Sequence, residues 1–439
     1  MVSPVSTASM PAIIWQFCCP YCSHIYIHGY IPQKFMLSTL VPLVKNKSGD
    51  LTSKDNYRPI AINSILSKIF ESIILNRYST LLETSHNQFG FKSKSSTDLC
   101  VFTLKQVVEY YRNRSSSIYV CFLDASKAFD RVNHWLLLKK LIVRQVPHYV
   151  IRLLVFWYTQ QLFCVKWGDA TSGYFHVKNG LRQGGILSPI LFNVFMDDLS
   201  VQLTASNTGC KLVGMTMNHL MYADDMALIA PSAKGLQTLI HISEGYASKH
   251  EILFNSVKSE CMCIAPKNVS LCHIPSVSLN KQPLKFCNTF KYLGYIITST
   301  MDDSLDISKQ MRSIYARSNM LTVKFGCCTR IVKTVLFQAY CTNLYCAHLW
   351  WDYKLDMYKK IMVAYNNSFR RFVGYTYDSS ASQMFLENNV HHFSVLRKKC
   401  LYNFMNRLIA SDNIIIKHIL ASNVMFHSSF YKEWCSKLF

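Results

Sequence analysis

Three of the scarce acidic residues of this chain end or interrupt apolar runs of strand length. The run 117–123 stops at Asp124, and Asp224 and Asp225 interrupt a second run, 220–229. A carboxylate placed against a buried strand is costly unless it is paired or holds a cation. Three carboxylates that converge at one edge of a sheet would repel one another, and a divalent metal relieves that repulsion. The pattern therefore predicts a buried sheet with a candidate metal site at one edge.

The Asp pairs have a simpler interpretation as well. Any single Asp-Asp pair is also typical of a solvated hairpin turn, so this alternative stays open for Asp224 and Asp225. A second pair, Asp197 and Asp198, comes late in the predicted helix 187–199. We interpret that second pair as a solvated helix terminus.

The charge balance favours a polyanionic partner. The chain has 47 Lys and Arg against 25 Asp and Glu, a formal net charge of +22. Each cation that neutralises a phosphate releases a condensed counterion, so nucleic acid is the expected partner class. Ribosomal, histone-like and membrane-surface proteins share this charge, so charge alone does not decide between them.

The cysteines and the apolar runs bear on the compartment. The 17 cysteines are scattered, which favours free thiols in a reducing compartment. Cys19 and Cys22, with His24 and His28 nearby, could be a zinc site, but the spacing of the four is cramped and no second knuckle follows. Incidental cysteines are therefore the favoured interpretation. No run reaches the roughly 18 apolar residues that cross a bilayer, and no secretory signal precedes the run 13–17. We expect an intracellular protein, nuclear or cytoplasmic, that is neither secreted nor transmembrane and has no stable membrane association.

Apolar periodicity predicts a mixed order of strands and helices. Strands are expected at 40–45, 117–123, 218–230 (two, joined at Asp224-Asp225) and 290–297. Helices are expected at 65–82, 99–112, 134–143 and 187–199, and the chain beyond about 300 is expected to be helical and basic. This order is typical of an α+β body followed by a helical extension.

Six sequence blocks resemble, in order, those of reverse transcriptases, and their variants are most similar to the non-LTR (LINE-type) retrotransposon enzymes. The blocks are NYRPI (56–60), QFGF (88–91), FLDASKAFD (122–130), GLRQGGILSP (180–189) followed by LFN (191–193), YADD (222–225) and KYLG (291–294). They lie within residues 40–297, more than half of the chain. A single block is weak evidence, whereas six in the same order are specific.

The resemblance implies a right-hand polymerase of the α+β class. It assigns fingers to 40–115, a palm with an antiparallel sheet to 116–300, a helical thumb to 301–375 and a basic helical extension to 376–439. Residues 1–39 form a poorly defined N-terminal segment. The implied activity is RNA-directed DNA polymerisation, with an RNA template, a DNA primer and dNTPs as partners.

The resemblance also implies the metal ligands. Asp124 and Asp224 would be the main ligands of two Mg²⁺ ions, or Mn²⁺, with the carbonyl of Ala125 assisting. Asp225 would be a third acid at the same site. Lys258 resembles the family lysine that protonates the leaving pyrophosphate, although an isolated lysine after a strand is usually solvated.

Further residues are implied on the nucleotide side. Phe129 matches the aromatic residue that excludes a ribose 2′-hydroxyl, and core packing is its alternative. Gln183 and Gly184 match the segment beside the incoming nucleotide, where glycine permits close backbone approach. Arg58 could hold the triphosphate through its planar guanidinium, and a surface arginine beside a turn is its alternative.

The chain departs from complete elements of this family. Too few residues precede the first block for an endonuclease domain, and neither a C-terminal cysteine-histidine knuckle nor a ribonuclease H segment is recognisable. We therefore expect a truncated copy that cannot nick DNA by itself. The alternatives are a catalytically decayed nucleic-acid-binding remnant and a maturase-like RNA-binding protein; telomerase-like and viral RNA-copying polymerases fit the blocks less well.

Overall fold

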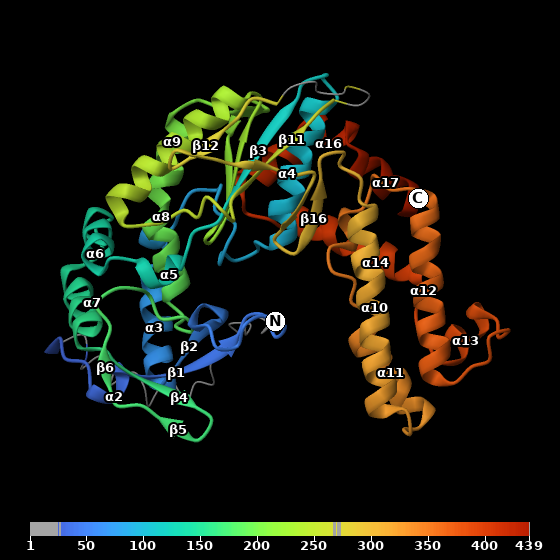
Figure 1. Ribbon diagram of the computed structural model, residues 1–439, viewed down its shortest axis with the longest axis horizontal. Helices are drawn as coiled ribbons and strands as arrows, with labels where there is room; N and C mark the ends of the chain where they lie inside the picture. Colours follow the sequence, from blue (N-terminus) through green and yellow to red (C-terminus); the bar gives the residue numbers. More distant parts are fainter. Residues whose placement is uncertain (1–24, 26–27, 267–268, 270–273, 439) are drawn as a thin grey trace. The chain divides into compact units, whose positions relative to one another are not determined.

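The computed structural model describes Ile25, residues 28–266, Val269 and residues 274–438 (Figure 1). The chain divides into two compact units, each built from segments that alternate along the sequence. Unit 1 comprises Met1–Gln88, Ala125–Gln202 and Ser243–Phe254, and unit 2 comprises Phe89–Asp124, Leu203–Ile242 and Asn255–Phe439. The interpretation of Cys19, Cys22 and His24, like most of the segment 1–39, lies outside the described residues.

Unit 1 contains a five-stranded sheet and short helices. The strands are β1 (Leu37–Val44), β2 (Tyr57–Asn63), β4 (Leu162–Trp167), β5 (Ala170–Thr171) and β6 (Phe175–His176). The helices are α2 (Gln33–Met36), α3 (Ile65–Arg77), α5 (Ala128–Arg131), α6 (His134–Val143) and α7 (His148–Gln160), with 3₁₀ turns at Lys54–Asn56 and Ser79–Leu82. The strand expected at 40–45 and the helix at 134–143 are confirmed. The helix expected at 65–82 ends at Arg77 and continues as the second 3₁₀ turn.

The helix α8 (Ser188–Ala205) begins in unit 1 and ends in unit 2. It runs past the predicted end at Leu199, so Asp197 and Asp198 lie inside it. The interpretation as a solvated terminus was wrong for Asp197, whereas Asp198 is exposed, although it too lies inside the helix. Asp197 is buried and accepts hydrogen bonds from the Arg144 guanidinium and, at 2.8 Å, from the Ser85 amide, while Asp198 pairs with Lys140.

Unit 2 is organised around a sheet of order β14-β11-β3-β10-β9. Its strands are β3 (Ile118–Leu123), β9 (His219–Tyr222), β10 (Asp225–Ala230), β11 (Glu260–Ile264) and β14 (Lys285–Phe286). All six residues of the central strand β3 are buried, and β10 and β11 pair with it antiparallel on its two sides. The predicted strands 117–123 and 218–230 are confirmed, as is the helix at 99–112, which is α4 (Thr97–Arg112). The helix α9 (Ala233–His250) follows β10, beginning in unit 2 and ending in unit 1.

One strand prediction was wrong. The segment 290–297 is a hairpin of β15 (Thr289–Tyr292) and β16 (Tyr295–Thr298), because the chain turns at Leu293 and Gly294. Their φ angles are 46° and 82°, so both central residues have positive φ, as in a type I′ turn. Because Leu293 is apolar, the sequence pattern does not indicate a turn at this position.

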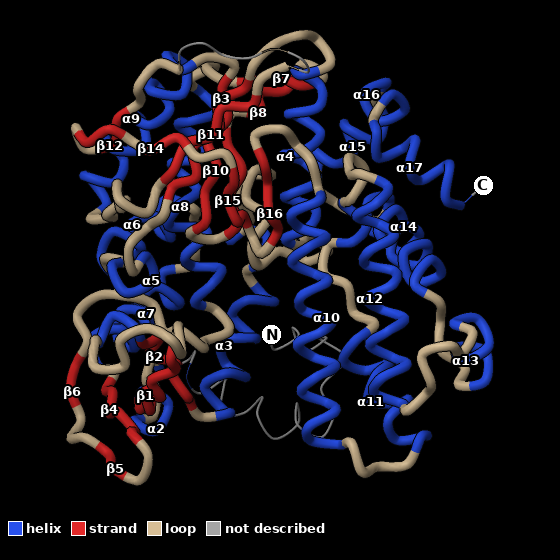
Figure 2. The backbone as a smooth tube through the Cα atoms, turned by 45° about the vertical axis from the view of Figure 1, so that its right-hand side comes forward, coloured by secondary structure: helices blue, strands red, loops and turns tan. Residues whose placement is uncertain are grey.

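The remainder of unit 2 is mainly helical, as predicted beyond residue 300. Its helices are α10 (Ser304–Phe325), α11 (Arg330–Cys341), α12 (Leu355–Val373), α13 (Ala381–Glu387), α14 (Phe393–Ile409), α15 (Ile414–Ala421), α16 (Asn423–His427) and α17 (Ser429–Leu438), with a 3₁₀ turn at Ala347–Leu349. Two hairpins complete it, β7 (Cys210–Leu212) with β8 (Met215–Met217) and β12 (Ser278–Leu279) with β13 (Gln282–Pro283). Helices α10, α11 and α12 pack side by side (Figure 2). Within the described residues, no helix is long and apolar enough to cross a membrane.

A buried lysine on α4 joins these helices to the β15–β16 hairpin. Lys105 on α4 is 1% exposed, and its ammonium group lies 2.6 Å from Asp303, just before α10. The same group donates to the Tyr295 hydroxyl of β16 at 3.1 Å and to the Leu349 carbonyl at 2.7 Å. Asp303 in turn accepts from the Trp351 amide at 2.8 Å. Every partner of this cation comes from a different segment, so its loss removes several tertiary contacts together.

We predict that Lys105→Met lowers the free energy of unfolding by about 3–5 kcal/mol, because it leaves the buried Asp303 carboxylate without its cation. The matched control is Lys360→Met on α12, where Lys360 forms an exposed i,i+4 pair with Asp356. That change should cost less than about 0.5 kcal/mol. Urea unfolding followed by circular dichroism measures both. Equal losses for the two variants would contradict the structural role of Lys105.

Candidate active site

Strand register places two of the predicted carboxylates at the same edge of the unit 2 sheet. Asp124 directly follows β3, and Asp225 is the first residue of β10. The last registered pair between these strands is Met226 with Leu123, so one further step brings Asp225 opposite Asp124. Directly opposite residues of antiparallel strands have Cβ atoms about 4.5–5.5 Å apart and point to the same face. The sequence prediction that these two acids converge agrees with this register.

The third carboxylate lies in a strained turn. Asp225 pairs with Tyr222, so the two-residue loop is Ala223 and Asp224 rather than the predicted Asp224-Asp225. Ala223 has a φ of 57°, which costs an alanine about 1–2 kcal/mol relative to ordinary backbone. A positive φ at the first central residue is the feature of a type II′ hairpin turn. Asp224 is half-buried and Asp225 is exposed, so the turn presents carboxylates at the end of an otherwise buried hairpin.

The backbone of Asp124 is fixed on both sides by one turn of unit 2. The Asp124 amide donates to the Ser259 hydroxyl at 3.1 Å, and the Asp124 carbonyl accepts from the Asn255 amide at 2.9 Å. Lys258 lies in the same turn, where its amide donates to the Asn255 side chain at 3.3 Å, and its ammonium group is exposed. The sequence predicted a chemical role for Lys258 but not the turn in which this residue lies. The sequence analysis missed Asn255 and Ser259, whose spacing around Lys258 was the available signal.

Aromatic and thiol groups surround the carboxylate edge. Phe91 of the QFGF block lies against Tyr222 with ring centroids 6.4 Å apart. Burial, with a smaller contribution from the negative charge of Asp225, raises the pKa of the Cys100 thiol to about 12. The Cys100 thiol is therefore neutral at neutral pH, and the carboxylates are the charged groups of this edge.

The donor set at this edge fits a hard divalent cation. Mg²⁺ prefers oxygen ligands and is usually held by one or two carboxylates, with water and substrate phosphates completing its shell. Asp124 and Asp225, opposite each other and open to solvent, meet that requirement. Among the described residues, no group of three or more His, Cys, Asp or Glu side chains gathers tightly enough to hold a metal ion. The described residues thus supply a few carboxylate ligands, as is usual for Mg²⁺, and leave the other coordination positions to water and substrate.

In unit 1 a buried glutamate anchors the glycine-rich block. Glu71 on α3 is 2% exposed, lies 2.9 Å from the Arg182 guanidinium, and accepts from the amides of Ile186 and Leu187. Arg182 also lies over the Trp157 ring, 4.5 Å from its centroid. The sequence analysis missed Glu71. An acidic residue beside the apolar Phe70 and Ile74 in a helical pattern was the available signal.

Two predicted nucleotide-side residues, Gln183 and Phe129, have defined partners inside the protein. Gln183 donates from its side-chain amide to Asp130 at 3.0 Å, and both residues are exposed or partly exposed. Phe129 stacks on Phe192 of α8 with centroids 4.4 Å apart and planes 13° apart. The packing alternative for Phe129 therefore has a definite partner, while its ring remains partly accessible. Asp130, which the sequence analysis did not assign, fixes the side chain of Gln183.

A close contact within the protein itself requires a glycine at position 184. Its φ is 127°, and a Cβ added there would lie 2.5 Å from the Ala61 carbonyl oxygen of β2. The neighbouring Gln183 carbonyl accepts from the Ala61 amide at 2.7 Å. The close approach that requires glycine is thus to β2. Arg58, on the same strand, is exposed, and Ala125 is buried and bridges to Phe254.

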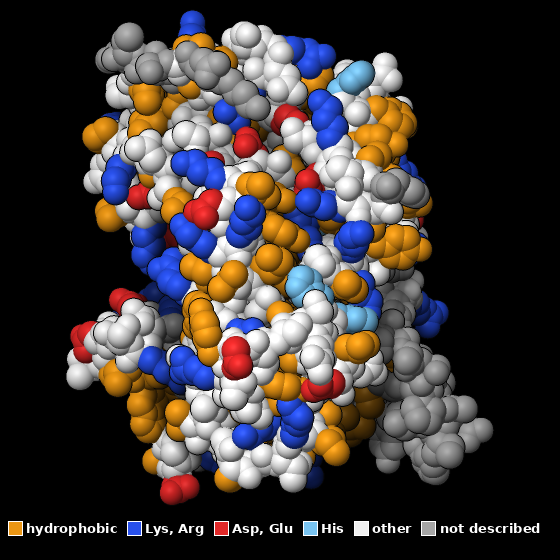
Figure 3. Space-filling model, turned by 90° about the vertical axis from the view of Figure 1, so that its right-hand side faces the viewer, with side chains coloured by type: hydrophobic (Ala, Val, Ile, Leu, Met, Phe, Trp, Pro, Cys, Tyr) orange, Lys and Arg blue, Asp and Glu red, His pale blue; other side chains and the backbone are white. Residues whose placement is uncertain are grey.

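Exposed cations cover the helical part of unit 2. Figure 3 shows Lys and Arg side chains spread over the face that it views. Exposed examples on the helices and their ends are Arg312, Lys324, Arg330, Lys354, Lys359, Lys360, Arg371, Lys398 and Lys399. Arg397, which precedes Lys398 and Lys399 in the sequence, is 1% exposed and donates to the Trp350 carbonyl, so it belongs to the core.

A central antiparallel strand that ends in one carboxylate beside a hairpin carrying two more is the arrangement of a right-hand polymerase palm, in an α+β protein. The family model described as "Reverse transcriptase (RNA-dependent DNA polymerase)" matches residues 44–297. The chain belongs to this family. The expected resemblance to non-LTR reverse transcriptases is confirmed by the curated relatives.

Three curated relatives illustrate the similarity. The RNA-directed DNA polymerase from mobile element jockey of Drosophila melanogaster is 26% identical, over 70% of this chain and 35% of its own length. The probable RNA-directed DNA polymerase from transposon X-element of the same species is 29% identical, over 66% and 31%. The Pol polyprotein from type-1 retrotransposable element R2 of Nasonia vitripennis is 26% identical, over 63% and 27%. The chain thus spans about a third of the length of these relatives.

Two telomerase structures are among the solved structures with a similar backbone. Apo telomerase from Candida tropicalis is 14% identical with a TM-score of 0.48, over 96% of this chain and 68% of that chain. Telomerase from Candida albicans, in complex with a fragment of telomeric RNA, is 12% identical with a TM-score of 0.43, over 98% and 69%.

We predict that Gly184→Ala destabilises unit 1 by about 1–3 kcal/mol, because the new Cβ combines a positive φ with a clash against backbone that cannot move aside. The control is Gly173→Ala, where an added Cβ meets nothing within 4 Å and φ is not positive. Thermal unfolding of the two variants gives the comparison. An unchanged unfolding temperature for Gly184→Ala would show that β2 yields to the methyl group.

Proposed function

We propose that this protein is an RNA-directed DNA polymerase, the reverse transcriptase of a non-LTR retrotransposon. The observation that carries the proposal is the register of β3 with β10, which brings Asp124 and Asp225 together beside the Asp224 turn. The family match over residues 44–297 and the curated relatives, themselves named RNA-directed DNA polymerases, support the same activity. In this proposal residues 40–115 act as fingers, 116–300 as palm and 301–375 as thumb, with 376–439 as a basic extension.

Asp124, Asp224 and Asp225 would hold two Mg²⁺ ions, with Mn²⁺ as a substitute and the Ala125 carbonyl as a further oxygen ligand. Such ions, when bound, activate the attacking hydroxyl and neutralise charge on the departing phosphate. The residues of the chain would contribute by holding the carboxylates in position. Asn255 and Ser259 fix the Asp124 backbone, and the strained Ala223 holds the hairpin that carries Asp224. Phosphoryl transfer depends on such positioning more than on covalent chemistry by the protein.

Lys258 would donate a proton to the leaving pyrophosphate. Its ammonium group is exposed, and the turn that carries it is hydrogen-bonded to the backbone of Asp124. A cation tethered to the loop that positions a metal ligand is well placed to meet an anionic leaving group. A lysine that is only solvated is the alternative role for this exposed side chain.

Four residues of unit 1 would act on the incoming nucleotide. Arg58 would hold the triphosphate through its exposed guanidinium, and Phe129 would exclude a ribose 2′-hydroxyl. Gln183 and Gly184 would lie beside the base pair, in a loop that Glu71 and Asp130 position. These roles come from the match of each residue to the family's motifs.

The partners in this proposal are an RNA template, a DNA primer and dNTPs. The exposed lysines and arginines of α10 to α14 would contact phosphates of the RNA–DNA hybrid. Contacts of this kind are independent of sequence and weaken steeply with salt.

We predict that Asp224→Asn lowers primer extension at least about 100-fold, equivalent to about 2.7 kcal/mol, because it removes a metal-ligand charge while preserving side-chain size. The assay extends oligo-dT on poly-A with dTTP and Mg²⁺. Asp169→Asn is the control, since Asp169 is exposed in the loop between β4 and β5 and makes the same charge change. Extension by Asp224→Asn at the rate of the parent would refute the proposal, provided both proteins bind the hybrid equally.

A further inference from the structure

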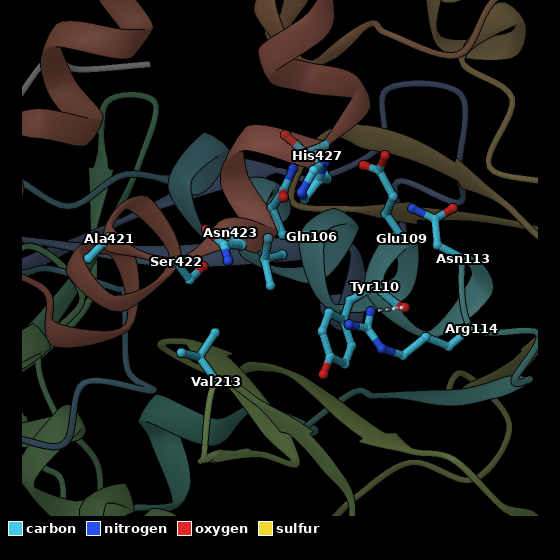
Figure 4. Close-up of a pocket in the computed structure, with 12 residues that line it drawn as sticks. Gln106, Glu109, Tyr110, Asn113, Arg114, Val213, Ala421, Ser422, Asn423 and His427 are labelled. Carbon is cyan, nitrogen blue, oxygen red and sulfur yellow. Dashed lines mark hydrogen bonds between the residues drawn. The ribbon is translucent and has the colours of Figure 1, made fainter.

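A cavity of about 500 Å³ lies in unit 2 at the C-terminal end of α4 (Figure 4). Its lining includes Gln106, Glu109, Tyr110, Arg114, Asn423 and His427. The six residues of β3 start just after this end of α4 and run to Asp124, a rise of about 20 Å. The cavity is therefore separate from the carboxylate edge, and its volume is typical of a small-molecule site.

The walls of the cavity are fixed to α4 by hydrogen bonds. The Tyr111 hydroxyl accepts from the Lys211 amide at 2.7 Å and donates to the Lys211 carbonyl at 3.2 Å, which holds the β7–β8 hairpin with Val213. The Ser429 amide donates to Glu109 Oε1 at 2.7 Å, which holds the chain around α16. The cavity is thus formed by segments of unit 2 that hydrogen bonds hold to α4.

Three polar atoms of α4 at this cavity are buried and unsatisfied. Gln106 is 0% exposed, and neither its Oε1 nor its Nε2 has a hydrogen-bond partner. Glu109 uses Oε1 for the Ser429 amide, and its Oε2 is buried without a partner. Figure 4 shows both side chains extending from α4 toward His427. Buried polar atoms are nearly always paired, so a cluster of two acceptors and one donor group indicates a polar occupant.

The rim adds a flat, cationic surface. The Arg114 guanidinium lies over the Tyr110 ring, 3.6 Å from its centroid, and Asn113, Asn423 and His427 are exposed around the opening. A guanidinium stacked on a ring can bind a phosphate at its edge or an aromatic base on its face. The cavity therefore combines a polar interior with an anion-binding mouth, which suits a nucleotide.

We propose that this cavity binds the guanine base of a nucleotide. The hydrogen-bonding edge of guanine carries two donor groups, N1–H and N2–H₂, and one acceptor, O6, which complements two unsatisfied acceptors and one unsatisfied donor. Adenine and cytosine each carry one donor group on that edge, and so does uracil, so each leaves a buried acceptor unpaired. A site built to satisfy such atoms discriminates strongly against ligands that leave them unpaired. The site is independent of the proposed polymerase chemistry.

The test is calorimetric titration of the full chain with guanosine 5′-monophosphate in EDTA. A monophosphate is no polymerase substrate, and EDTA removes the metal through which a nucleotide could bind the carboxylate edge. We expect one guanosine monophosphate per chain, with adenosine, cytidine and uridine monophosphates binding at least about tenfold more weakly. A titration without binding, or equal binding of all four nucleotides, would overturn the proposal and leave a water-filled cavity.

Two variants connect binding to the unsatisfied atoms. Gln106→Met removes both amide atoms at similar size, and Glu109→Gln replaces an acceptor with a donor while the Ser429 amide keeps an oxygen partner. Each variant should bind guanosine monophosphate at least about tenfold more weakly than the parent. Gln106→Met should unfold at the parent's temperature or above, because it removes unpaired buried groups. Glu83→Gln, an exposed position in unit 1, is the control and should bind like the parent.

A further arm distinguishes the source of the base. A single-stranded oligoadenylate with one central guanosine will bind more tightly than the monophosphate if the natural occupant is a base of an RNA strand. It will bind no more tightly if the occupant is a free nucleotide. Unchanged affinity of either probe for Glu109→Gln would contradict the assigned site.

Discussion

The antiparallel pairing of β3 with its two neighbours is the constraint on which the carboxylate edge depends. All six residues of β3 are buried, and both flanking strands, β10 and β11, contribute buried residues at nearly every position. A slip of one residue would turn every buried side chain of β10 to the opposite face, so the register is strongly specified. Because that register is fixed, Asp225 stands opposite Asp124 at the edge of the sheet.

The acidic residues of the protein fall into two groups by environment. Glu71, Asp98, Asp303 and Asp306 are buried, and each accepts hydrogen bonds from, or pairs with, a cation or a backbone amide. These carboxylates join segments far apart in sequence, as when Asp98 on α4 pairs with Arg407 on α14. The carboxylates of the sheet edge are half-buried or exposed. Burial with a partner stabilises the fold, whereas solvent access leaves a carboxylate able to take a ligand.

Much of the fold follows from sequence pattern, because apolar periods report which face of an element is buried. The strand at 117–123 and the helix at 134–143 were predicted nearly to the residue. The hairpin at 290–297 was missed because Leu293, an apolar residue, adopts the positive φ of a turn. Asp197 was misjudged because its partners, Arg144 and Ser85, are distant in sequence.

The residues of the candidate site likewise include some that the sequence pattern predicts and some that it does not. Asp124, Asp224 and Asp225 were identified from local pattern and from the family's motifs. Glu71, Asn255 and Ser259 act through tertiary hydrogen bonds, which local pattern does not contain. Gly184 was predicted to be small for a nucleotide, while the structure gives the approach of β2 as a sufficient reason.

The central claim is that the edge formed by β3 and β10 holds divalent cations. Electron paramagnetic resonance of Mn²⁺, with the protein bound to an RNA–DNA hybrid and a non-hydrolysable dNTP analogue, counts these ions directly. We predict two tightly bound Mn²⁺ ions in the parent and fewer in Asp124→Asn, with Asp169→Asn unchanged. Equal Mn²⁺ occupancy in the parent and in Asp124→Asn would contradict the claim and assign the carboxylates of this edge a structural role.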